Sequence, residues 1–329
     1  MKCSVVIRAY NESAHIGKLL AGVARQTCRD VEVILVDSGS TDDTVEIARS
    51  HGARIVHVRP EDFTFGRSLN MGIEAASREL VVIASAHVYP VYPDWIERLL
   101  GPFAAPEVGL VYGRQRGAAG SKFSEQCIFR QWFPDEDISP QHHPFCNNAN
   151  AAIRRSLWEQ HRYDESLTGL EDVAWAKWAQ SQGRQVAYAA HAEVVHIHAE
   201  TMRGVYDRYR REGMAFKRIF PESHFSIYDF VRLSFSNILG DLRQARAEHL
   251  LLKSSGSIAW FRLAQFWGTY QGYRHSSAVT QELRERFYYP HGTEPRKPGQ
   301  RDVRPIQYNE AAPATRSEDQ EQPDSLRDA

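Results

Sequence analysis

Cysteine is scarce in this sequence, with four residues among 329, and no two of them form a Cys-x-x-Cys pair. A disulfide scaffold and a thiolate zinc site are therefore excluded, and low cysteine usage is typical of a reducing cytoplasm. Long apolar runs are also missing, since none reaches the roughly 18 residues that a membrane-spanning helix needs. The first residues become charged too early for a signal peptide. These absences predict a cytoplasmic protein, at most peripheral to the inner face of the membrane.

An excess of either charge sign is absent as well, because 40 Lys and Arg residues balance 41 Asp and Glu residues. Nucleic acid is therefore not expected as a partner, since phosphate backbones attract an excess of basic residues. The apolar fraction of 42% is sufficient for a full core. Fourteen histidines remain as candidate ligands.

What is present is an alternation of strand and helix patterns over residues 1–103. Short β-branched runs at 4–7, 31–36, 54–58 and 80–84 have the pattern of strands covered on both faces. Helical patterns follow at 14–26, 42–51, 67–76 and 93–103. The alternation predicts an α/β fold around a mostly parallel sheet, in which ligands bind beyond the carboxyl ends of the strands.

Three regions are predicted along the chain. Residues 1–201 continue the α/β pattern, with strands at 108–112, 185–188 and 193–196 and helices at 121–132, 156–160 and 172–182. Residues 202–289 become helical, with arginines between aromatic residues. Residues 290–329 are rich in Pro, Arg, Glu, Asp and Ser and poor in apolar positions, which is typical of a disordered tail.

Polar residues follow the first two strand patterns. The first strand runs into the segment 8–12 (RAYNE), and the second ends in Asp37 and continues as 38–44 (SGSTDDT). The hydroxyl and carboxylate groups of 40–44 can cap the first turn of a following helix, which is the structural explanation of this loop. For Asp37 we favour a functional role, because a carboxylate at a strand end can accept hydrogen bonds from a base imide or a ribose hydroxyl.

Together, the segments 4–12 (SVVIRAYNE) and 37–44 (DSGSTDDT) resemble the opening of family 2 glycosyltransferases. The resemblance covers about residues 1–200 and implies the GT-A fold, a Rossmann-like sheet flanked by helices, here with a C-terminal helical extension. It also implies an inverting enzyme that uses a nucleotide-diphosphate sugar. Segments 37–40 and 65–72 (FGRSLNMG) are most similar to bacterial rhamnosyltransferase-like members. Rhamnose as the donor sugar and a growing surface polysaccharide as the acceptor are implied by this resemblance alone.

The resemblance also implies which residues hold the donor. Ala9 and Glu12 would line the nucleoside, Asp37 would bind the base, and Ser40 belongs to the same nucleotide-binding loop. Arg67 would approach the diphosphate or the base. A solvated arginine in the first turn of a helix is the alternative explanation of Arg67.

The family usually carries an Asp-x-Asp motif after the fourth strand, where two carboxylates hold a divalent cation against the donor diphosphate. This chain has Ser85 and His87 at the corresponding positions. Three explanations stay open: His87 is a metal ligand, histidines and arginines hold the diphosphate without a metal, or the site is degenerate. The expectation of Mg²⁺ or Mn²⁺ as a cofactor stays open with them.

The segment 194–198 (VVHIH) contains a second candidate ligand. His196 and His198 share one face of a strand-like segment, so the pair could bind a metal ion or bracket a phosphate. The resemblance places a histidine of the metal or diphosphate site here, and His198 would then form an imidazole-based site with His87. The alternative is that these histidines only mark the end of a strand and bind nothing.

Adjacent carboxylates at Glu171 and Asp172 open a predicted helix. Such residues are stabilised by the helix dipole, which is their structural explanation. An inverting transfer also needs a base that takes the proton of the acceptor hydroxyl. The family places this base in a Glu-Asp motif, and Asp172 matches the second residue. Glu171 would orient the acceptor or the loop.

Three asparagines precede this motif, at Asn147, Asn148 and Asn150. Their amide groups suit the hydroxyls of an acceptor sugar. The resemblance places an acceptor-side wall in the same region. Asparagine clusters also form turns, and the sequence does not decide between the two.

The helical region 202–289 interleaves basic and aromatic residues, as in 205–211 (VYDRYRR). This composition suits contact with an anionic membrane surface and therefore a lipid-linked acceptor, as an alternative to a free glycan. Packing of the aromatic residues on the core or in a homodimer is the other explanation. Nucleotidyl transfer on a similar sheet would require a glycine-rich basic loop after the first strand, which this sequence lacks. The missing Asp-x-Asp motif suggests a non-catalytic sugar-nucleotide-binding or scaffold protein as the alternative, and the Glu-Asp pair argues against it.

Overall fold

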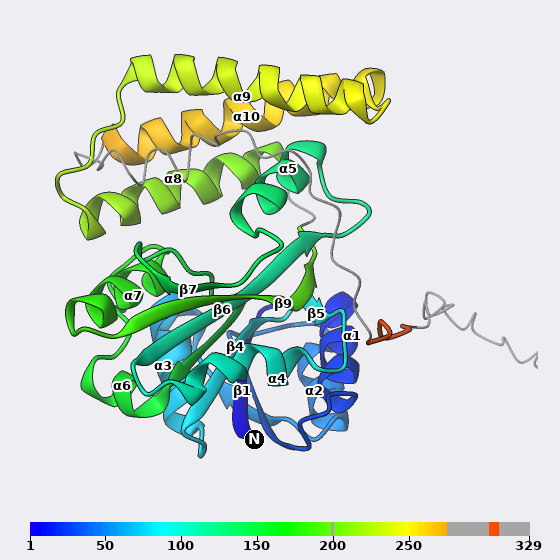
Figure 1. Cartoon of the computed structure of the whole chain (residues 1–329), viewed down its shortest axis with the longest axis vertical. Coiled ribbons are helices and arrows are strands. Elements are labelled where there is room, and N and C mark those ends of the chain that lie inside the picture. The colour runs from blue at the N-terminus through cyan, green and yellow to red at the C-terminus, as the bar shows by residue number, and fades with distance from the viewer. Residues whose placement is uncertain (199–200, 275–302, 309–329) are drawn as a thin grey trace, which may run out of the picture.

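The computed structural model describes residues 1–198, 201–274 and 303–308 of the chain. Its centre is a nine-stranded sheet with the strand order β3-β2-β1-β4-β8-β6-β9-β5, in which β7 pairs with β9 (Figure 1). The strands are β1 (Lys2–Ala9), β2 (Asp30–Asp37), β3 (Arg54–His57), β4 (Leu80–Ser85), β5 (Val88–Pro90), β6 (Val108–Gly117), β7 (Ile138–Gln141), β8 (Asn150–Arg154) and β9 (Gln185–His196).

The sheet has a parallel half and a mixed half. Strand β1 pairs in parallel with β2 and β4, and β2 pairs in parallel with β3, so their carboxyl ends meet at one edge as the sequence predicts. Strand β8 runs antiparallel to β4 on one side and to β6 on the other. The expectation of a mostly parallel sheet is therefore wrong for the C-terminal half. Strand β8 reads Asn-Ala-Ala-Ile-Arg, a composition with little β-propensity, so its pairing depends on tertiary contacts.

Helices cover both faces of the sheet. The α/β part contains α1 (Ser13–Ala24), α2 (Thr44–Ser50), α3 (Phe65–Ala75), α4 (Trp95–Leu100), α5 (Phe123–Trp132), α6 (Arg155–Gln160), α7 (Glu171–Ser181) and the 3-10 helices η1 (Pro60–Asp62) and η2 (Gly101–Ala104). Helices α1, α2 and α4 pack on one face, and α3, α6 and α7 pack on the other. Neighbouring residues of β1 alternate between the two cores, Val5 toward the first and Val6 toward the second.

Gly72 sets the distance between α3 and the sheet. A Cβ atom at this position would lie 2.4 Å from Val6 Cγ1 and 2.7 Å from Val36 Cγ2. Both distances are far below van der Waals contact, so only glycine lets α3 lie this close to β1 and β2. Close packing holds the N-terminal end of α3, which carries Arg67, against the carboxyl edge of the parallel strands.

Three long helices form a separate layer: α8 (Met202–Ile219), α9 (Ile227–Ala247) and α10 (Leu251–Arg274). Figure 1 shows α8 facing the sheet and α9 on the outside of this layer. A buried ion pair joins α9 to α10, because the Arg262 guanidinium donates to both oxygens of Asp241, at 2.8 and 2.9 Å. In the described part of the chain, no helix combines the length and apolar character of a membrane span. Residues 275–289 of the predicted helical region lie outside the described residues.

Residues 303–308 fall within the predicted disordered tail, yet they contact the α/β part. The Ile306 amide donates to the carbonyl of Val91 at 2.9 Å, and the Tyr308 hydroxyl donates to the carbonyl of Pro90 at 2.6 Å. The Arg25 side chain donates to the carbonyl of residue 307 at 2.7 Å. For this short segment the expectation of disorder differs from the structure. The remaining residues of the predicted tail lie outside the described part.

Candidate functional site

The loops after β1 and β2 are joined by hydrogen bonds. The Asn11 amide donates to Ser40 Oγ at 2.9 Å, and the Thr41 amide donates to Asn11 Oδ1 at 2.8 Å. The Glu12 amide donates to Thr44 Oγ1 at 2.7 Å. Asn11 has a φ of 53°, a left-handed conformation that asparagine tolerates better than most residues. Ser40 therefore holds the first loop in place instead of capping α2, and its contact with a nucleotide stays a prediction.

Asp37 ends β2 as a buried carboxylate, with 3% of its surface exposed. It accepts hydrogen bonds from the amides of Gly39, at 3.2 Å, and Ser40, at 3.1 Å, and His57 Nδ1 lies 3.3 Å from Asp37 Oδ2. Ala9 is its neighbour in the register of β1 and β2. The loop thus orients the Asp37 carboxylate at the strand end. Binding of a base by Asp37 and Ala9 stays a prediction.

Arg67 lies in the first turn of α3, which is capped by Thr64, whose Oγ1 accepts from the Arg67 amide at 3.0 Å. The Arg67 side chain is 44% exposed, and its guanidinium lies 3.9 Å from the similarly exposed Glu165 carboxylate. This weak ion pair leaves the guanidinium in contact with solvent. A role of Arg67 at a diphosphate is compatible with this exposure and stays a prediction.

The ends of β1 and β4 lie side by side, since Arg8 and Ser85 are partners in the strand register. His87 follows Ser85, and its Nδ1 lies 2.6 Å from Glu12 Oε1. Two residues that were predicted separately, His87 and Glu12, therefore form a hydrogen-bonded pair at the carboxyl edge of the sheet.

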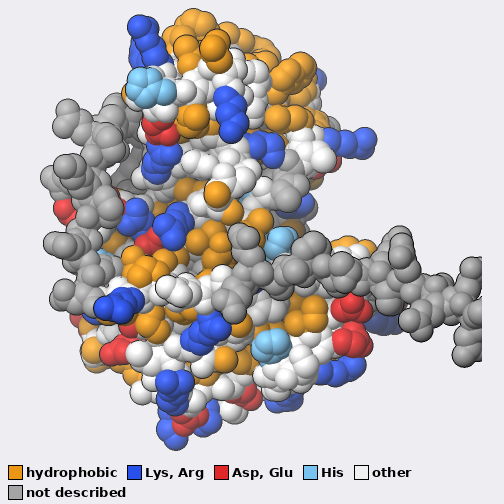
Figure 2. Space-filling model, turned by 90° about the vertical axis from the view of Figure 1, so that its right-hand side faces the viewer, with side chains coloured by type: hydrophobic (Ala, Val, Ile, Leu, Met, Phe, Trp, Pro, Cys, Tyr) orange, Lys and Arg blue, Asp and Glu red, His pale blue; other side chains and the backbone are white. Residues whose placement is uncertain are grey.

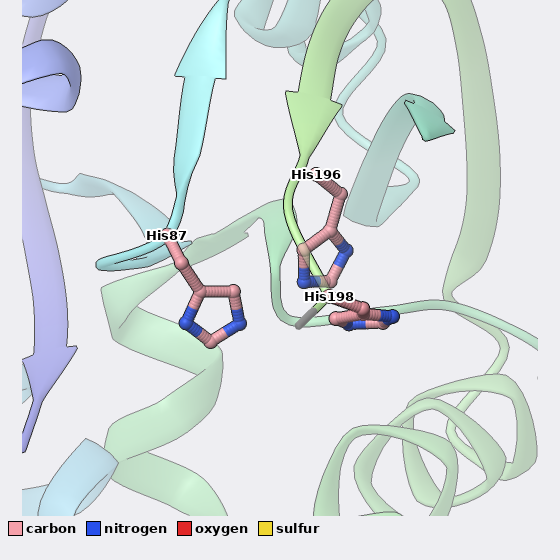
Figure 3. A group of neighbouring side chains, drawn as sticks. All are labelled: His87, His196 and His198. Atoms are coloured by element: carbon pink, nitrogen blue, oxygen red, sulfur yellow. The ribbon is translucent and has the colours of Figure 1, made fainter. Parts of the chain in front are cut away.

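Three histidines form a cluster beside this pair. Figure 3 shows the rings of His87, from the loop after β4, and of His196 and His198, from the end of β9, turned toward a common space. One ring nitrogen of each lies within 4.8 Å of the others. The ring centroids of His196 and His198 are 4.0 Å apart. Burial, followed by the neighbouring imidazoles, lowers the pKa of His196 well below its usual value. The sequence pairs His198 with His196 on one strand face and with His87 through the family resemblance, and the structure brings all three together.

Residues from other elements surround the cluster. Gln115 Oε1 on β6 lies 2.7 Å from His196 Nδ1, and Glu125 Oε1 on α5 lies 2.6 Å from His198 Nδ1. The Arg208 guanidinium on α8 donates to the same Glu125 oxygen at 3.1 Å. Burial raises the pKa of Glu125, but the hydrogen bond from His198 and the Arg208 charge outweigh burial and leave the pKa below its usual value. Sequence reasoning missed Gln115, Glu125 and Arg208.

The arginines of α8 belong to this edge of the molecule. Arg208 is only 16% exposed at the histidine cluster. The guanidiniums of Arg211 and Arg8 both lie over the ring of Phe65, at 5.1 and 5.0 Å from its centroid. The sequence of the 205–211 segment suits either membrane contact or packing. For Arg208 and Arg211 the structure supports packing against the α/β part.

Glu171 and Asp172 begin α7, after Leu170 in a left-handed conformation with a φ of 55°. Glu171 is 4% exposed and accepts a hydrogen bond from the Arg8 guanidinium at 3.1 Å. Because Arg8 neighbours Ser85, this ion pair holds the start of α7 against the ends of β1 and β4. Leu170 carries an unfavourable backbone conformation, which is typical of functional sites that surrounding contacts hold in place.

Asp172 is buried, with 8% of its surface exposed. Its carboxylate accepts from the amides of Asn148, at 3.0 Å, and Val173, at 2.8 Å. Burial and then the Glu171 charge raise the pKa of Asp172 to about 7, and the two amides and Arg8 oppose the shift. A carboxylate with a pKa near neutrality is suited to general base catalysis.

The three asparagines differ in what they contact. Asn150 is fully buried, its Nδ2 donates to the carbonyls of residues 114 and 192, and its Oδ1 accepts from Trp95 Nε1 at 2.9 Å. The prediction that Asn150 binds the acceptor is therefore wrong, because its amide is used within the sheet. Asn147 Oδ1 accepts from the Ala149 amide at 2.9 Å, as in a turn. Asn148 lies against Asp172 through its backbone, and its acceptor role stays a prediction.

Comparison with known proteins assigns this architecture to a family. Residues 4–162 match the family model described as glycosyl transferase family 2. The chain is 27% identical over 227 residues to the O-antigen chain rhamnosyltransferase RfbN of Salmonella typhimurium, covering 65% of this chain and 72% of that protein. It is 25% identical over 224 residues to the O-antigen chain rhamnosyltransferase WbaN of Salmonella anatum, covering 64% and 71%.

Solved structures confirm the GT-A fold. The mannosyltransferase PcManGT from Pyrobaculum calidifontis, in complex with GDP-Man and Mn²⁺, superposes with a TM-score of 0.56 at 20% identity, covering 83% of this chain and 84% of that one. TarS residues 1–349 of S. aureus superpose with a TM-score of 0.52 at 18% identity, covering 84% and 92%. Both matches extend beyond the α/β part, given the share of the chain that they cover.

Proposed function

Because the chain belongs to glycosyl transferase family 2, we propose that this glycosyltransferase transfers rhamnose from a nucleotide-diphosphate donor to a hydroxyl of a growing bacterial surface polysaccharide. The rhamnosyl donor and the surface polysaccharide are supported by the similarity to two O-antigen chain rhamnosyltransferases. The observation that carries the chemistry is Asp172, a buried carboxylate that two backbone amides hold at the start of α7, beside the buried Glu171.

The reaction is an inverting displacement in this proposal. The acceptor oxygen attacks the anomeric carbon while the bond from that carbon to the diphosphate oxygen breaks. Asp172 takes the proton of the acceptor hydroxyl, and the nucleoside diphosphate leaves with the bonding electron pair. Glu171, held by Arg8 at 3.1 Å, is a positioning residue, because it fixes the first turn of α7 and its charge contributes to the raised pKa of Asp172.

Donor binding is assigned to the loops after β1, β2 and β4 and to the start of α3. Ala9, Glu12, Asp37 and Ser40 would contact the nucleoside, and Arg67 would neutralise part of the diphosphate charge. A divalent cation at the diphosphate belongs to the proposal as well, since PcManGT was solved with GDP-Man and Mn²⁺. The side chains that this chain offers to such a cation are histidine imidazoles instead of carboxylates.

A donor screen tests the proposed substrate. At a donor concentration about 100 times the dissociation constant, binding stabilises the folded state by about 2.7 kcal/mol. For a domain of this size, that corresponds to an increase in melting temperature of about 5 °C. We expect this increase with a nucleoside diphosphate rhamnose and a smaller one with UDP-GlcNAc or GDP-mannose. Equal stabilisation by all three donors would contradict the rhamnosyl assignment. NMR of the product linkage would then test inversion at the anomeric carbon.

The outer helices point to a lipid-linked acceptor. Exposed apolar residues occur at helical spacing on α9, at Ile227, Val231 and Phe235, and on α10, at Trp260 and Trp267. The two stripes adjoin, because the ring centroids of Trp267 on α10 and Phe230 on α9 are 5.3 Å apart. Figure 2 shows hydrophobic side chains gathered over this layer, with Lys and Arg beside them.

Charge favours an anionic bilayer as the occupant of this face. Apart from the buried Arg262–Asp241 pair, residues 227–274 contain five Lys and Arg and two Asp and Glu, whereas the whole chain is near neutrality. A cationic surface with exposed Trp and aliphatic side chains is typical of interfacial membrane binding. An acceptor carried on a lipid would then reach the enzyme at the bilayer surface.

Vesicle sedimentation tests this surface. We expect the protein to sediment with vesicles that contain about 30% anionic lipid and much less with neutral vesicles, since basic residues gain about 1 kcal/mol each near an anionic surface. The variant Phe235→Ser/Trp260→Ser and the variant Arg243→Gln/Arg246→Gln should each reduce binding at least fivefold. Arg29→Gln/Arg49→Gln, on exposed arginines of the α/β part, is the charge-matched control. A wild-type chain that binds no vesicles and elutes as a dimer would assign the face to a second copy.

A further inference from the structure

The cluster of His87, His196 and His198 offers imidazole nitrogens to a cation, whereas the Asp-x-Asp motif of the family offers carboxylate oxygens. Ser85 and His87 occupy the strand end, and the nearby carboxylates of Glu12 and Glu125 contact histidine Nδ1 atoms at 2.6 Å. Mg²⁺ prefers oxygen ligands in near-octahedral geometry and is rarely held by imidazole. These residues therefore do not fit Mg²⁺.

The same residues fit a first-row transition metal. Imidazole suits Zn²⁺, Co²⁺, Ni²⁺ and Cu²⁺, and three histidines with one open position form a known type of zinc site. One nitrogen from each of His87, His196 and His198 lies within 4.8 Å of the others. Two ligands at about 2.0–2.1 Å from one Zn²⁺ lie about 3.3 Å apart at tetrahedral angles. Small rotations of the side chains would bring the nitrogens to that spacing.

Each ring is oriented as a metal-bound histidine usually is. Nδ1 of His87 lies 2.6 Å from Glu12 Oε1, and Nδ1 of His198 lies 2.6 Å from Glu125 Oε1. Nδ1 of His196 lies 2.7 Å from the side-chain amide oxygen of Gln115 on β6. Metal-ligating histidines typically donate their other N–H to a carboxylate or an amide oxygen, which fixes the tautomer and raises the basicity of the ligating nitrogen. With Nδ1 turned toward these oxygens, Nε2 is the nitrogen that each ring would present to the ion.

His196 provides an independent indication of a ligand. Its Nε2 is buried and has no hydrogen-bond partner among the residues that the structure describes. A buried polar atom without a partner costs about 1–3 kcal/mol. Figure 3 shows a nitrogen of this ring on the side that faces His87. A bound cation would satisfy that nitrogen.

Direct binding of the diphosphate by a protonated cluster is the competing arrangement. It needs imidazolium charges on rings whose centroids lie 4.0 to 5.9 Å apart. Like charges at that distance repel, most strongly at a buried site. A single divalent cation held by neutral imidazoles places a charge of +2 there without this repulsion.

We propose that His87, His196 and His198 form a three-imidazole site for a divalent transition metal ion, with Zn²⁺ and Co²⁺ preferred over Mg²⁺. Glu12, Gln115 and Glu125 orient the ligands. The inference deepens the proposed function, because a metal bound here would meet the donor diphosphate. Two carboxylate ligands would cancel the charge of the ion, whereas three neutral imidazoles leave it at +2 for the diphosphate.

Metal titration of the full chain, first stripped with EDTA and then dialysed, tests the site without any donor. We expect one Co²⁺ per chain with visible d–d absorption, and Zn²⁺ binding at least 100-fold tighter than Mg²⁺ when measured against a chromophoric chelator. His196→Gln and His87→Gln should each weaken Zn²⁺ binding at least 100-fold. Glu125→Gln should weaken it 10- to 100-fold, as expected for a group that orients a ligand. His51→Gln, an exposed histidine at the end of α2, is the matched control.

Some outcomes would overturn the site. One is wild-type protein without Co²⁺ absorption or Zn²⁺ affinity. The other is Zn²⁺ affinity that is unchanged in both histidine variants. If His196→Gln fails to fold, as judged by its melting transition, the variant His87→Gln decides, because His87 is only partly buried. Because no donor or activity enters the measurement, failure of the metal site is distinguishable from failure of the proposed transfer.

Discussion

Asp172→Asn is expected to lower the transfer rate by about 10²- to 10⁴-fold, the usual contribution of a general base. The physical reason is that an amide cannot take the acceptor proton, whereas the Asp172 carboxylate is anchored by the amides of Asn148 and Val173 at 3.0 and 2.8 Å. Because Asn keeps the shape and an acceptor oxygen, donor binding should change less than threefold. Initial rates and donor-dependent melting temperatures, measured on the same preparations, check both expectations.

Two further variants separate catalysis from folding. Asp207→Asn changes an exposed carboxylate on α8, in a long 3.6 Å ion pair, and should leave the rate unchanged. Asp172→Glu keeps a carboxylate in a tight space and should recover part of the rate. A rate in Asp172→Asn within threefold of wild type, with the correct donor, would remove Asp172 from the role of base.

The parallel half of the sheet could be predicted from sequence, whereas the mixed half could not. Strands β1, β2 and β4 contain buried apolar runs, as cover on both faces requires, whereas β3 is short and partly exposed. Each is separated from the next by a turn or helix pattern. Strand β8 contains two alanines and begins at Asn150, which resembles a polar turn in a linear reading. Its position between β4 and β6 is fixed by pairing partners far away in the chain. Such pairings leave no local signal.

The same limit explains which site residues were found. His87, His198 and Glu12 follow strand ends, so a rule about carboxyl edges finds them. Glu125 and Arg208 reach the histidines from α5 and α8, and only the tertiary fold brings them there. Glu125 lies in an ordinary helical sequence, so nothing near it in the chain indicates that its carboxylate contacts His198. The arginine run on α8 was visible, but composition alone could not distinguish a membrane face from a site wall.

Arg8 illustrates how a motif residue gains its meaning. It belongs to the segment that suggested the family, yet no role followed from its position alone. In the structure its guanidinium lies 5.0 Å from the centroid of the Phe65 ring and 3.1 Å from a Glu171 oxygen. It therefore links the first strand to the acidic pair, 163 residues further along the chain. The ion pair also stabilises a second carboxylate beside Asp172, and that neighbour contributes to its raised pKa.

The pH dependence of activity and of stability should have opposite signs at Asp172. Burial and the Glu171 charge raise the pKa of Asp172 from 3.8 to about 7, and the base must be ionised to act. Below pH 7, kcat/KM should therefore fall about tenfold per pH unit, as expected for one essential ionised base. Between the unfolded and folded pKa values, the folded state binds more protons at Asp172 than the unfolded state does. Its contribution to the free energy of unfolding thus decreases as pH rises through this window.

Subtracting the Asp172→Asn variant isolates this contribution, because other groups titrate in both proteins. Between pH 5 and pH 8, the melting temperature of wild type minus that of the variant should be largest at pH 5 and should decrease steadily toward pH 8, where the ionised buried carboxylate is least favourable. Activity of wild type should rise over the same interval. Parallel melting curves against pH for the two proteins would show that Asp172 keeps an ordinary pKa in the folded chain. A base with that pKa would be ionised throughout, and the rate would then be flat across the interval. The two measurements must therefore agree, and together they determine whether the buried carboxylate is tuned for proton transfer.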